Sequence, residues 1–135
     1  MKRPAAVLVS ALMGCAAPGA MDDAMHAPLA GPGDAERGRA VFVAREGGHC
    51  VLCHAAPGVP LAGNVGPPLE GVGARLSPAQ IRMRIADISR VNPRATMPSF
   101  HRTEGLVRVA PQYAGKPALT GQQVEDLVAW LGTLR

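Results

Sequence analysis

Two cysteines and a histidine in one short run are the residues of this chain best suited to chemistry. Cys50 and Cys53 stand three positions apart, and His54 follows at once. At this spacing both thiols can form thioethers with the two vinyl groups of one porphyrin, while the histidine reaches the iron from the proximal side. A redox dithiol and half of a zinc site are the alternatives. Zinc is disfavoured, because the chain has no second cysteine pair and His49 lies too close to His54 to complete a tetrahedron easily. The run therefore predicts one covalently bound haem c.

The aromatic content agrees with a large apolar cofactor. The 135 residues include two Phe, one Tyr and one Trp. A domain of this length has a modest core, and with so few rings something else must fill its centre. A porphyrin would do so. An exported binding lipoprotein without haem would leave the shortage of aromatic residues unexplained.

The first residues predict export. Lys2 and Arg3 precede an apolar stretch and then small residues, which is the layout of a secretory signal peptide, here residues 1–15. Residues 12–15, Leu-Met-Gly-Cys, resemble a bacterial lipobox, at which Cys15 would carry a lipid anchor. Ordinary cleavage a few residues later is the alternative. The expected location is the periplasm, either free or anchored to a membrane.

Residues 16–33 are rich in Ala, Pro and Gly and have no apolar periodicity, so we expect a flexible linker before a single domain at 34–135. The net charge of the whole chain is +4. Between residues 75 and 108 seven arginines face only Asp87 and Glu104. This stretch could be a docking face for an acidic partner or ordinary solvated surface. Aromatic and basic residues are not interleaved, so nucleic acid is not expected as a partner.

Capping residues predict three helices. Asp34 begins the first, which runs to about Ala44. Ser77 begins the second, with proline at the first helical position, and the Asn92-Pro93 pair ends it. Thr120 begins the third.

The apolar faces of these helices predict the core. They consist of Ile81, Ile85 and Ile88 in the second helix, and of Val124, Leu127, Val128 and Leu131 in the third, flanked by Trp130 and Leu134. Residues 55–73 and 94–119 are predicted to be loops around the cofactor, because prolines and glycines interrupt them. No strand pattern of useful length is present, so the fold is expected to be all-α.

Over residues 34–135 this layout resembles class I cytochrome c. In that family the first and last helices cross near a glycine and aromatic side chains, which here would place Gly38 and Phe42 against Leu127, Trp130 and Leu131. The resemblance implies a fold of three main helices, with long loops around one covalently bound haem.

The same family has a Gly-Pro-x-Leu element after the haem motif, and residues 66–69 match it. The resemblance implies that the carbonyl of Pro67 accepts a hydrogen bond from the free ring nitrogen of His54. Such a bond fixes the tautomer of the ring and raises its basicity as a ligand.

Met97, in the run Thr96-Met97-Pro98, is the expected second axial ligand of the iron. A thioether on a loop stiffened by proline can be held against the iron, and it raises the reduction potential. His101 is close enough along the chain to compete, and a loop methionine can simply fill space in a core. Met83 is a weaker candidate, because it lies off the apolar face of its helix.

The C-terminal part is similar to a narrower family, SoxX, the small cytochrome subunits of the bacterial sulfur-oxidation complex SoxAX. The similarity lies in residues 94–100, 105–111, 114–117 and 119–129. It implies a periplasmic heterodimer with a SoxA-like subunit, which joins thiosulfate oxidatively to a cysteine of a SoxYZ-like carrier protein. This chain has no spare thiol for that reaction. The implied role is therefore that of a non-catalytic subunit, which passes electrons one at a time to a downstream acceptor. A stand-alone electron carrier is the alternative.

Overall fold

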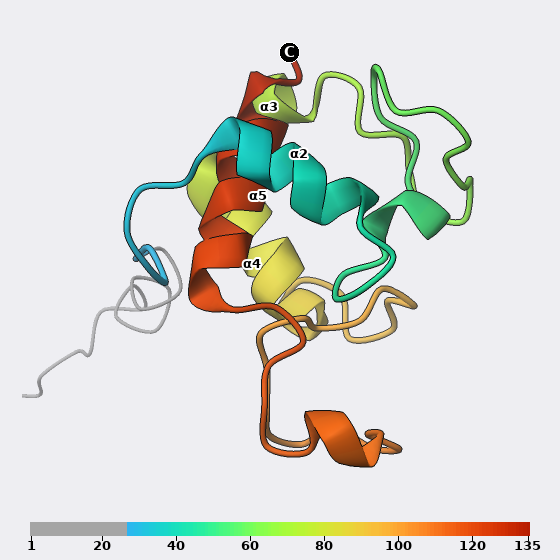
Figure 1. Cartoon of the computed structure of the whole chain (residues 1–135), viewed down its shortest axis with the longest axis vertical. Coiled ribbons are helices and arrows are strands. Elements are labelled where there is room, and N and C mark those ends of the chain that lie inside the picture. The colour runs from blue at the N-terminus through green and yellow to red at the C-terminus, as the bar shows by residue number, and fades with distance from the viewer. Residues whose placement is uncertain (1–26) are drawn as a thin grey trace, which may run out of the picture.

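The computed structural model describes residues 27–135 (Figure 1). The expected signal peptide, Cys15 and the first part of the expected linker lie outside the described residues. The helices are α2 (Ala35–Val43), α3 (Val72–Arg75), α4 (Pro78–Asp87) and α5 (Gly121–Thr133). Three 3-10 turns join them, η1 (Cys50–Leu52), η2 (Ile88–Arg90) and η3 (Pro111–Tyr113). Residues 27–135 contain no strand, and the predicted all-α, cytochrome c-like class is confirmed. In this part of the chain, no helix has the length and apolar character needed to span a membrane.

The three main helices begin where their capping residues predict. The Asp34 side chain accepts a hydrogen bond from the backbone of Arg37, and Ser77 and Thr120 each form a complete capping box. These contacts are local, and they satisfy amide groups that the first turn of a helix leaves unpaired.

The structure differs from the sequence-based expectation at the end of α4. The expected helix runs to Asn92, whereas α4 ends at Asp87 and continues as the 3-10 turn η2. Asp87 leaves the helical region, with φ −152° and ψ 85°, and its carboxylate accepts a hydrogen bond from the backbone of Ser89. This side-chain bond to the backbone replaces the helical pattern. Consequently Ile88 is only half-buried, whereas Ile81 and Ile85 are buried as expected.

Helix α3 begins in the last two residues of the segment 55–73, which was expected to be a loop, and ends at Arg75. It is short, and its position depends on the C-terminal end of α5. The amide of Gly73 donates to the carbonyl of Leu134 at 2.9 Å. A Cβ added to Gly73 would lie 2.4 Å from the carbonyl oxygen of Gly132, so only glycine permits this approach.

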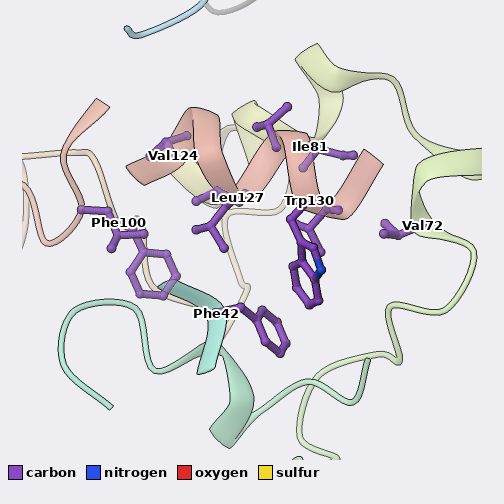
Figure 2. Packing of buried hydrophobic residues seen from close by; sticks show 11 residues of the cluster. Phe42, Val72, Ile81, Phe100, Val124, Leu127 and Trp130 are labelled. Atoms are coloured by element: carbon purple, nitrogen blue, oxygen red, sulfur yellow. The ribbon is translucent and has the colours of Figure 1, made fainter. Parts of the chain in front are cut away.

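The core forms where α2 crosses α5 (Figure 2). Gly38 allows the two backbones to approach, because a Cβ there would lie 1.9 Å from the carbonyl oxygen of Asp126. One turn further along, the rings of Phe42 and Trp130 pack with their centroids 4.8 Å apart. The cluster around this crossing consists of Phe42, Val72, Ile81, Ile85, Phe100, Leu119, Val124, Leu127, Val128, Trp130 and Leu131.

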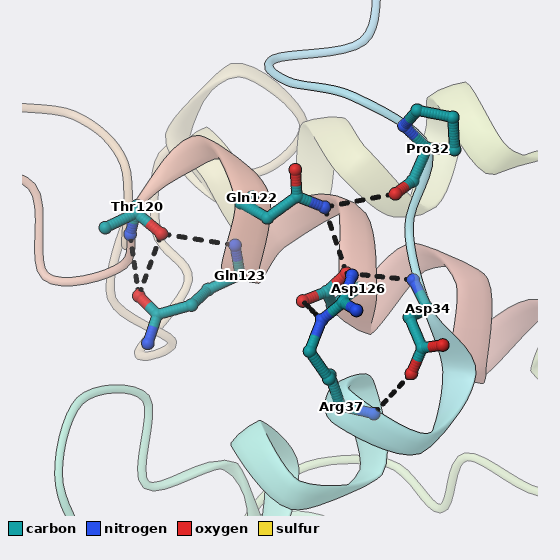
Figure 3. A network of polar contacts seen from close by, with 7 residues as sticks. All are labelled: Pro32, Asp34, Arg37, Thr120, Gln122, Gln123 and Asp126. Atoms are coloured by element: carbon teal, nitrogen blue, oxygen red, sulfur yellow. Dashed lines mark hydrogen bonds and ion pairs between the residues drawn. The ribbon is translucent and has the colours of Figure 1, made fainter.

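Two neighbouring carboxylates of α5 fasten other elements to it. Asp126 accepts hydrogen bonds from the backbone amide of Asp34 at 2.8 Å, from the guanidinium of Arg37 and from Gln122 (Figure 3). Glu125 forms a bidentate pair with Arg82 of α4, with distances of 2.6 and 2.7 Å, and both side chains are buried. Helices α2 and α4 are thus held to the same turn of α5.

Part of the expected linker also lies against α5. The amide of Leu29 donates to Glu125 at 2.9 Å, and Gln122 donates to the carbonyl of Pro32 at 3.1 Å. A Cβ at Gly33 would lie 2.0 Å from the carbonyl oxygen of Glu125. Residues 27–33 therefore follow the surface of the last helix.

These contacts change the pKa values of both carboxyl groups. The hydrogen bond from Arg37, helped by the amide of Asp34, lowers the pKa of Asp126 to about 2, against the opposing effect of burial. Burial alone would raise the pKa of Glu125, but the hydrogen bonds from Arg82 and Leu29 outweigh it and hold that pKa below its usual value.

Asp126→Asn should lower the free energy of unfolding by about 1–2 kcal/mol near neutral pH, because it removes the charge that Arg37 pairs with. Because the pKa of Asp126 is lower in the folded state, its contribution is complete above about pH 4 and is lost as the pH falls toward 2. Urea unfolding of the two proteins at neutral pH and near pH 2.5 should show this difference shrinking. Glu36→Gln, at an exposed position of α2, is the control and should leave stability nearly unchanged at neutral pH. A difference that is independent of pH would contradict the assignment.

Candidate haem-binding site

The cysteine pair lies on one tight turn. The backbone amides of Cys53 and His54 both donate to the carbonyl of Cys50, at 3.1 and 2.9 Å. His49 begins the turn in the left-handed region, with φ 50°. Both thiols are free and half-buried, and burial raises the pKa of the Cys50 thiol to about 11. The structure thus brings two thiols and the adjacent imidazole together at η1.

The imidazole of His54 is oriented by a backbone carbonyl. Its Nδ1 lies 2.8 Å from the carbonyl oxygen of Pro67. A carbonyl oxygen only accepts hydrogen bonds, so Nδ1 carries the proton and donates it. The lone pair of the ring is then on Nε2, which is the atom available to a metal.

Glycines let the following loop lie directly against the motif. A Cβ at Gly66 would lie 2.4 Å from Cε1 of His54, and a Cβ at Gly63 would lie 1.8 Å from the carbonyl oxygen of Leu52. The amides of Gly63 and Gly66 donate to the carbonyls of Val51 and Cys53, both at 2.8 Å. The ring of His54 is therefore held between its own turn and the backbone of residues 63–67.

Met97 is half-buried and packs against the edge of the core. Its segment is fixed to the end of α4, because the amides of Phe100 and His101 donate to the carbonyls of Ile85 and Ala86, both at 3.1 Å. Other half-buried apolar residues pack against the same core: Ala35, Val41, Cys50, Val51, Ala56, Val59, Leu69, Leu76 and Leu134. The cysteine turn, the loop that follows it and the Met97 segment thus all contribute to this half-buried apolar layer.

Asp87 holds the Met97 segment in place, a role that sequence reasoning missed. Its carboxylate accepts hydrogen bonds from the hydroxyls of Ser89 and Ser99, at 2.5 and 2.7 Å, and lies 3.6 Å from the guanidinium of Arg102. Burial opposes ionisation, but these bonds and the charge of Arg102 keep the pKa of Asp87 below its usual value. The Asp-x-Ser sequence at 87–89 could have predicted the local turn, because an Asp side chain commonly bonds to the backbone two residues further on.

His101 is placed differently from Met97. Its Nδ1 lies 2.8 Å from the carbonyl oxygen of Leu119, and its ring lines a cavity of about 150 Å³ together with Leu29 and Arg82. The ring thus faces the first described residues and the buried Arg82–Glu125 pair.

The arginine-rich stretch is not a uniform positive face. Arg82 is only 6% exposed and is neutralised by Glu125, while Arg90 and Arg102 both lie 3.6 Å from Asp87. Three of the seven arginines are therefore paired with carboxylates of the same chain.

The donor set fits a covalently attached porphyrin. Two free thiols lie on one turn, the Nδ1 of His54 is bonded to Pro67 so that Nε2 is left for a metal, and half-buried apolar residues, Cys50 among them, pack against the core nearby in the chain. Among residues 27–135, no three or more His, Cys, Asp or Glu side chains are grouped so as to hold a metal ion by themselves. Fold and motif together define a cytochrome c domain.

Comparison with known proteins agrees with this class. The family model described as cytochrome C oxidase, cbb3-type, subunit III matches residues 33–131, and the chain belongs to this cytochrome c family. A "Cytochrome c-553-like" protein of Synechocystis is 35% identical over 106 residues, which are 78% of this chain and 74% of that protein. Membership of the family implies a covalently bound haem c and a role in electron transfer.

A solved structure shows similarity to a more specific group of proteins within this class. A chain of the crystal structure of SoxXA from P. pantotrophus is 36% identical to this chain and superimposes with a TM-score of 0.70. The match covers 77% of this chain and 83% of the other. The resemblance to the SoxX family is thereby confirmed.

Gly66→Ala should disturb the site, because the new methyl group would overlap the His54 ring. Either the ring or the 63–67 backbone must move, which breaks the bond to Pro67 and costs about 1–3 kcal/mol. We expect a lower Tm and an altered haem absorption spectrum in protein matured with haem. Gly132→Ala is the control, because a Cβ there meets nothing within 4 Å. Equal spectra and equal Tm values for the two variants would contradict this account of the loop.

Proposed function

We propose that the thioether bonds to haem are made by Cys50 and Cys53, and that His54 and Met97 are the axial ligands of a single haem. The tautomer of His54 supports this, since Nδ1 is bonded to Pro67 and Nε2 is left for the iron. When bound, the haem supplies a centre that takes up and releases one electron at a time.

Met97 is proposed in preference to His101. Met97 and Cys50 are both half-buried and both pack against the buried core, whereas the ring of His101 is bonded to the carbonyl of Leu119. A thioether ligand favours the reduced state and raises the potential. If His54 and Met97 held the iron from its two sides, the haem would offer no position to a substrate. The residues of this chain would then hold and tune an electron carrier, without binding the molecule that is oxidised.

The chain is further proposed to be the electron-transfer subunit of a two-subunit S-thiosulfotransferase with a SoxA-like cytochrome. The observation that supports this most is the similarity to a chain of SoxXA over 77% of the sequence. In the proposed reaction, a carrier thiol (of a SoxYZ-like protein) and thiosulfate (S₂O₃²⁻) form a carrier S-thiosulfonate, with release of one proton and two electrons. The new S–S bond forms on the partner and carrier. This chain accepts the electrons singly and delivers them to a downstream oxidised acceptor.

A stand-alone electron carrier is the second candidate, and the similarity to a "Cytochrome c-553-like" protein favours it. Both functions use the same haem site. They differ in whether the chain requires a partner subunit, which is what the second experiment below measures.

The proposed location is the periplasm, either in solution or anchored through a lipid on Cys15. The support is the leader-like pattern of the first residues together with membership of the cytochrome c family. Cys15 lies outside the described residues, so this proposal depends on the sequence alone.

Met97→Ala should remove the sulfur-to-iron charge-transfer band of the oxidised protein. It should also lower the reduction potential, by roughly a tenth of a volt or more, since axial ligands tune haem potentials over about 0.8 V. Absorption spectroscopy and a redox titration measure both. Met83→Ala, in α4, is the control and should keep the band. If His101→Ala removes the band and Met97→Ala does not, the ligand assignment is wrong.

The functional proposal predicts that the purified chain alone accepts electrons but forms no thiosulfate adduct on a carrier cysteine. With a SoxA-like subunit and carrier present, two electrons should reach this chain for each adduct, since two are released in the coupling. Mass spectrometry of the carrier and absorption of the reduced haem measure the two quantities. If the partner and a generic oxidant modify the carrier equally fast whether or not this chain is present, the chain is a plain electron carrier.

A further inference from the structure

Residues 102–118, here called the arm, project from the body of the molecule. Figure 1 shows the segment leaving the body in orange, reaching η3 at its far end, and returning to α5. The two ends of the arm meet at the body, where the amide of Leu119 donates to the carbonyl of Phe100 at 2.9 Å. All residues from 103 to 116 are exposed. The arm therefore contributes nothing to the core, although it occupies a substantial part of the domain.

The arm nevertheless has a defined shape. At its base, Arg102 donates to the carbonyls of Glu104 and Gly105 at 2.9 and 2.8 Å, and to the hydroxyl of Ser89 at 2.8 Å. At its far end, the amide of Tyr113 donates to Ala110 at 2.9 Å. Preformed shape reduces the entropy lost when a surface binds a partner.

Apolar side chains of the arm face water. Val107 is 86% exposed and Tyr113 is 45% exposed, and Leu106 and Val109 are also exposed. Between the two valines, Arg108 has φ +57°, a left-handed conformation that a non-glycine residue adopts at some cost. Exposed apolar clusters and backbone strain of this kind are typical of interaction sites.

The composition of the arm favours a protein partner with an apolar surface and an acidic rim. Arg102 is paired with Asp87, which leaves two exposed basic side chains of the arm, Arg108 and Lys116, against Glu104. Tyrosine and arginine are the residues that protein interfaces favour. The arm lies between the two ends of the family match, which are residues 33 and 131.

We infer that the arm is the docking element for the SoxA-like subunit, with Val107 and Tyr113 as apolar contacts and Arg108 facing acidic groups. This inference rests on the proposed function. It specifies where the partner binds and by what chemistry.

Val107→Asp tests the inference, with Val91→Asp as the control. Val91 is also an exposed valine, at 41%, but it lies outside the arm and outside the loop that holds His54. The probe is the haem-containing SoxA-like subunit of the same organism, and isothermal titration calorimetry measures the Kd. Val107→Asp should raise the Kd at least about tenfold, because it places a charge in an apolar contact, while Val91→Asp should change it less than about threefold.

Arg108→Glu is a second variant. It should weaken binding and also reduce its dependence on salt, because it removes an attraction to the acidic rim. All three variants change exposed side chains, so they should keep the haem spectrum and the Tm of the unmodified chain.

The outcomes separate this inference from the function on which it rests. If the unmodified chain does not bind the SoxA-like subunit, the proposed function is wrong and the arm assignment fails with it. If the unmodified chain binds and Val107→Asp binds equally well, only the arm assignment fails. Loss of binding in Val91→Asp alone would place the partner beside η2 instead.

Two further outcomes would also overturn it. Sedimentation of the chain alone could show a dimer that Val107→Asp dissociates. Vesicles of phosphatidylglycerol and phosphatidylethanolamine could bind the chain in a manner that depends on Val107. Either result, with unchanged affinity for the SoxA-like subunit, would assign the arm to self-association or to a lipid surface.

Discussion

The close approach of α2 and α5 is the constraint on which the rest of the molecule depends. At Gly38 the backbone of one helix lies against the carbonyl of Asp126 in the other, and no side chain larger than hydrogen fits between them. This contact lets Phe42 reach Trp130, and it places Asp126 where it can bind the amide that begins α2. The cysteine turn follows directly after α2, so the crossing also determines where the haem motif sits.

The loops that form the site are fastened to this helical frame mainly by polar contacts. Pro67 orients His54, and Asp87 fastens the segment that carries Met97. Because Asp87 also lies beside Arg102, the base of the arm and the Met97 segment share one carboxylate. The structure therefore combines an apolar helix crossing, which supplies the stability, with local hydrogen bonds that position individual side chains.

Local signals made the helix starts and the haem motif predictable from the sequence. Ser77 and Thr120 cap the helices that they were expected to cap, because a capping box involves residues only three positions apart. The features that could not be predicted are those that depend on tertiary contacts. Helix α3 depends on Gly73 meeting the end of α5, and the burial of Arg82 depends on Glu125, far away in the sequence. The projecting shape of the arm could not be predicted either, because a short apolar run in the sequence does not show whether its side chains are buried or exposed.

The crossing that closes the fold also implies an order of events. The bond between Asp34 and Asp126 joins residues 92 positions apart, so nearly the whole domain must be synthesised before it can form. Chains emerge with the N-terminal end first, and residues 50–54 are therefore available long before α5 exists. During that interval the two thiols lack the packing that buries them in the folded chain. The long sequence separation of this one contact thus leaves the two thiols accessible until the last helix is available to close the fold.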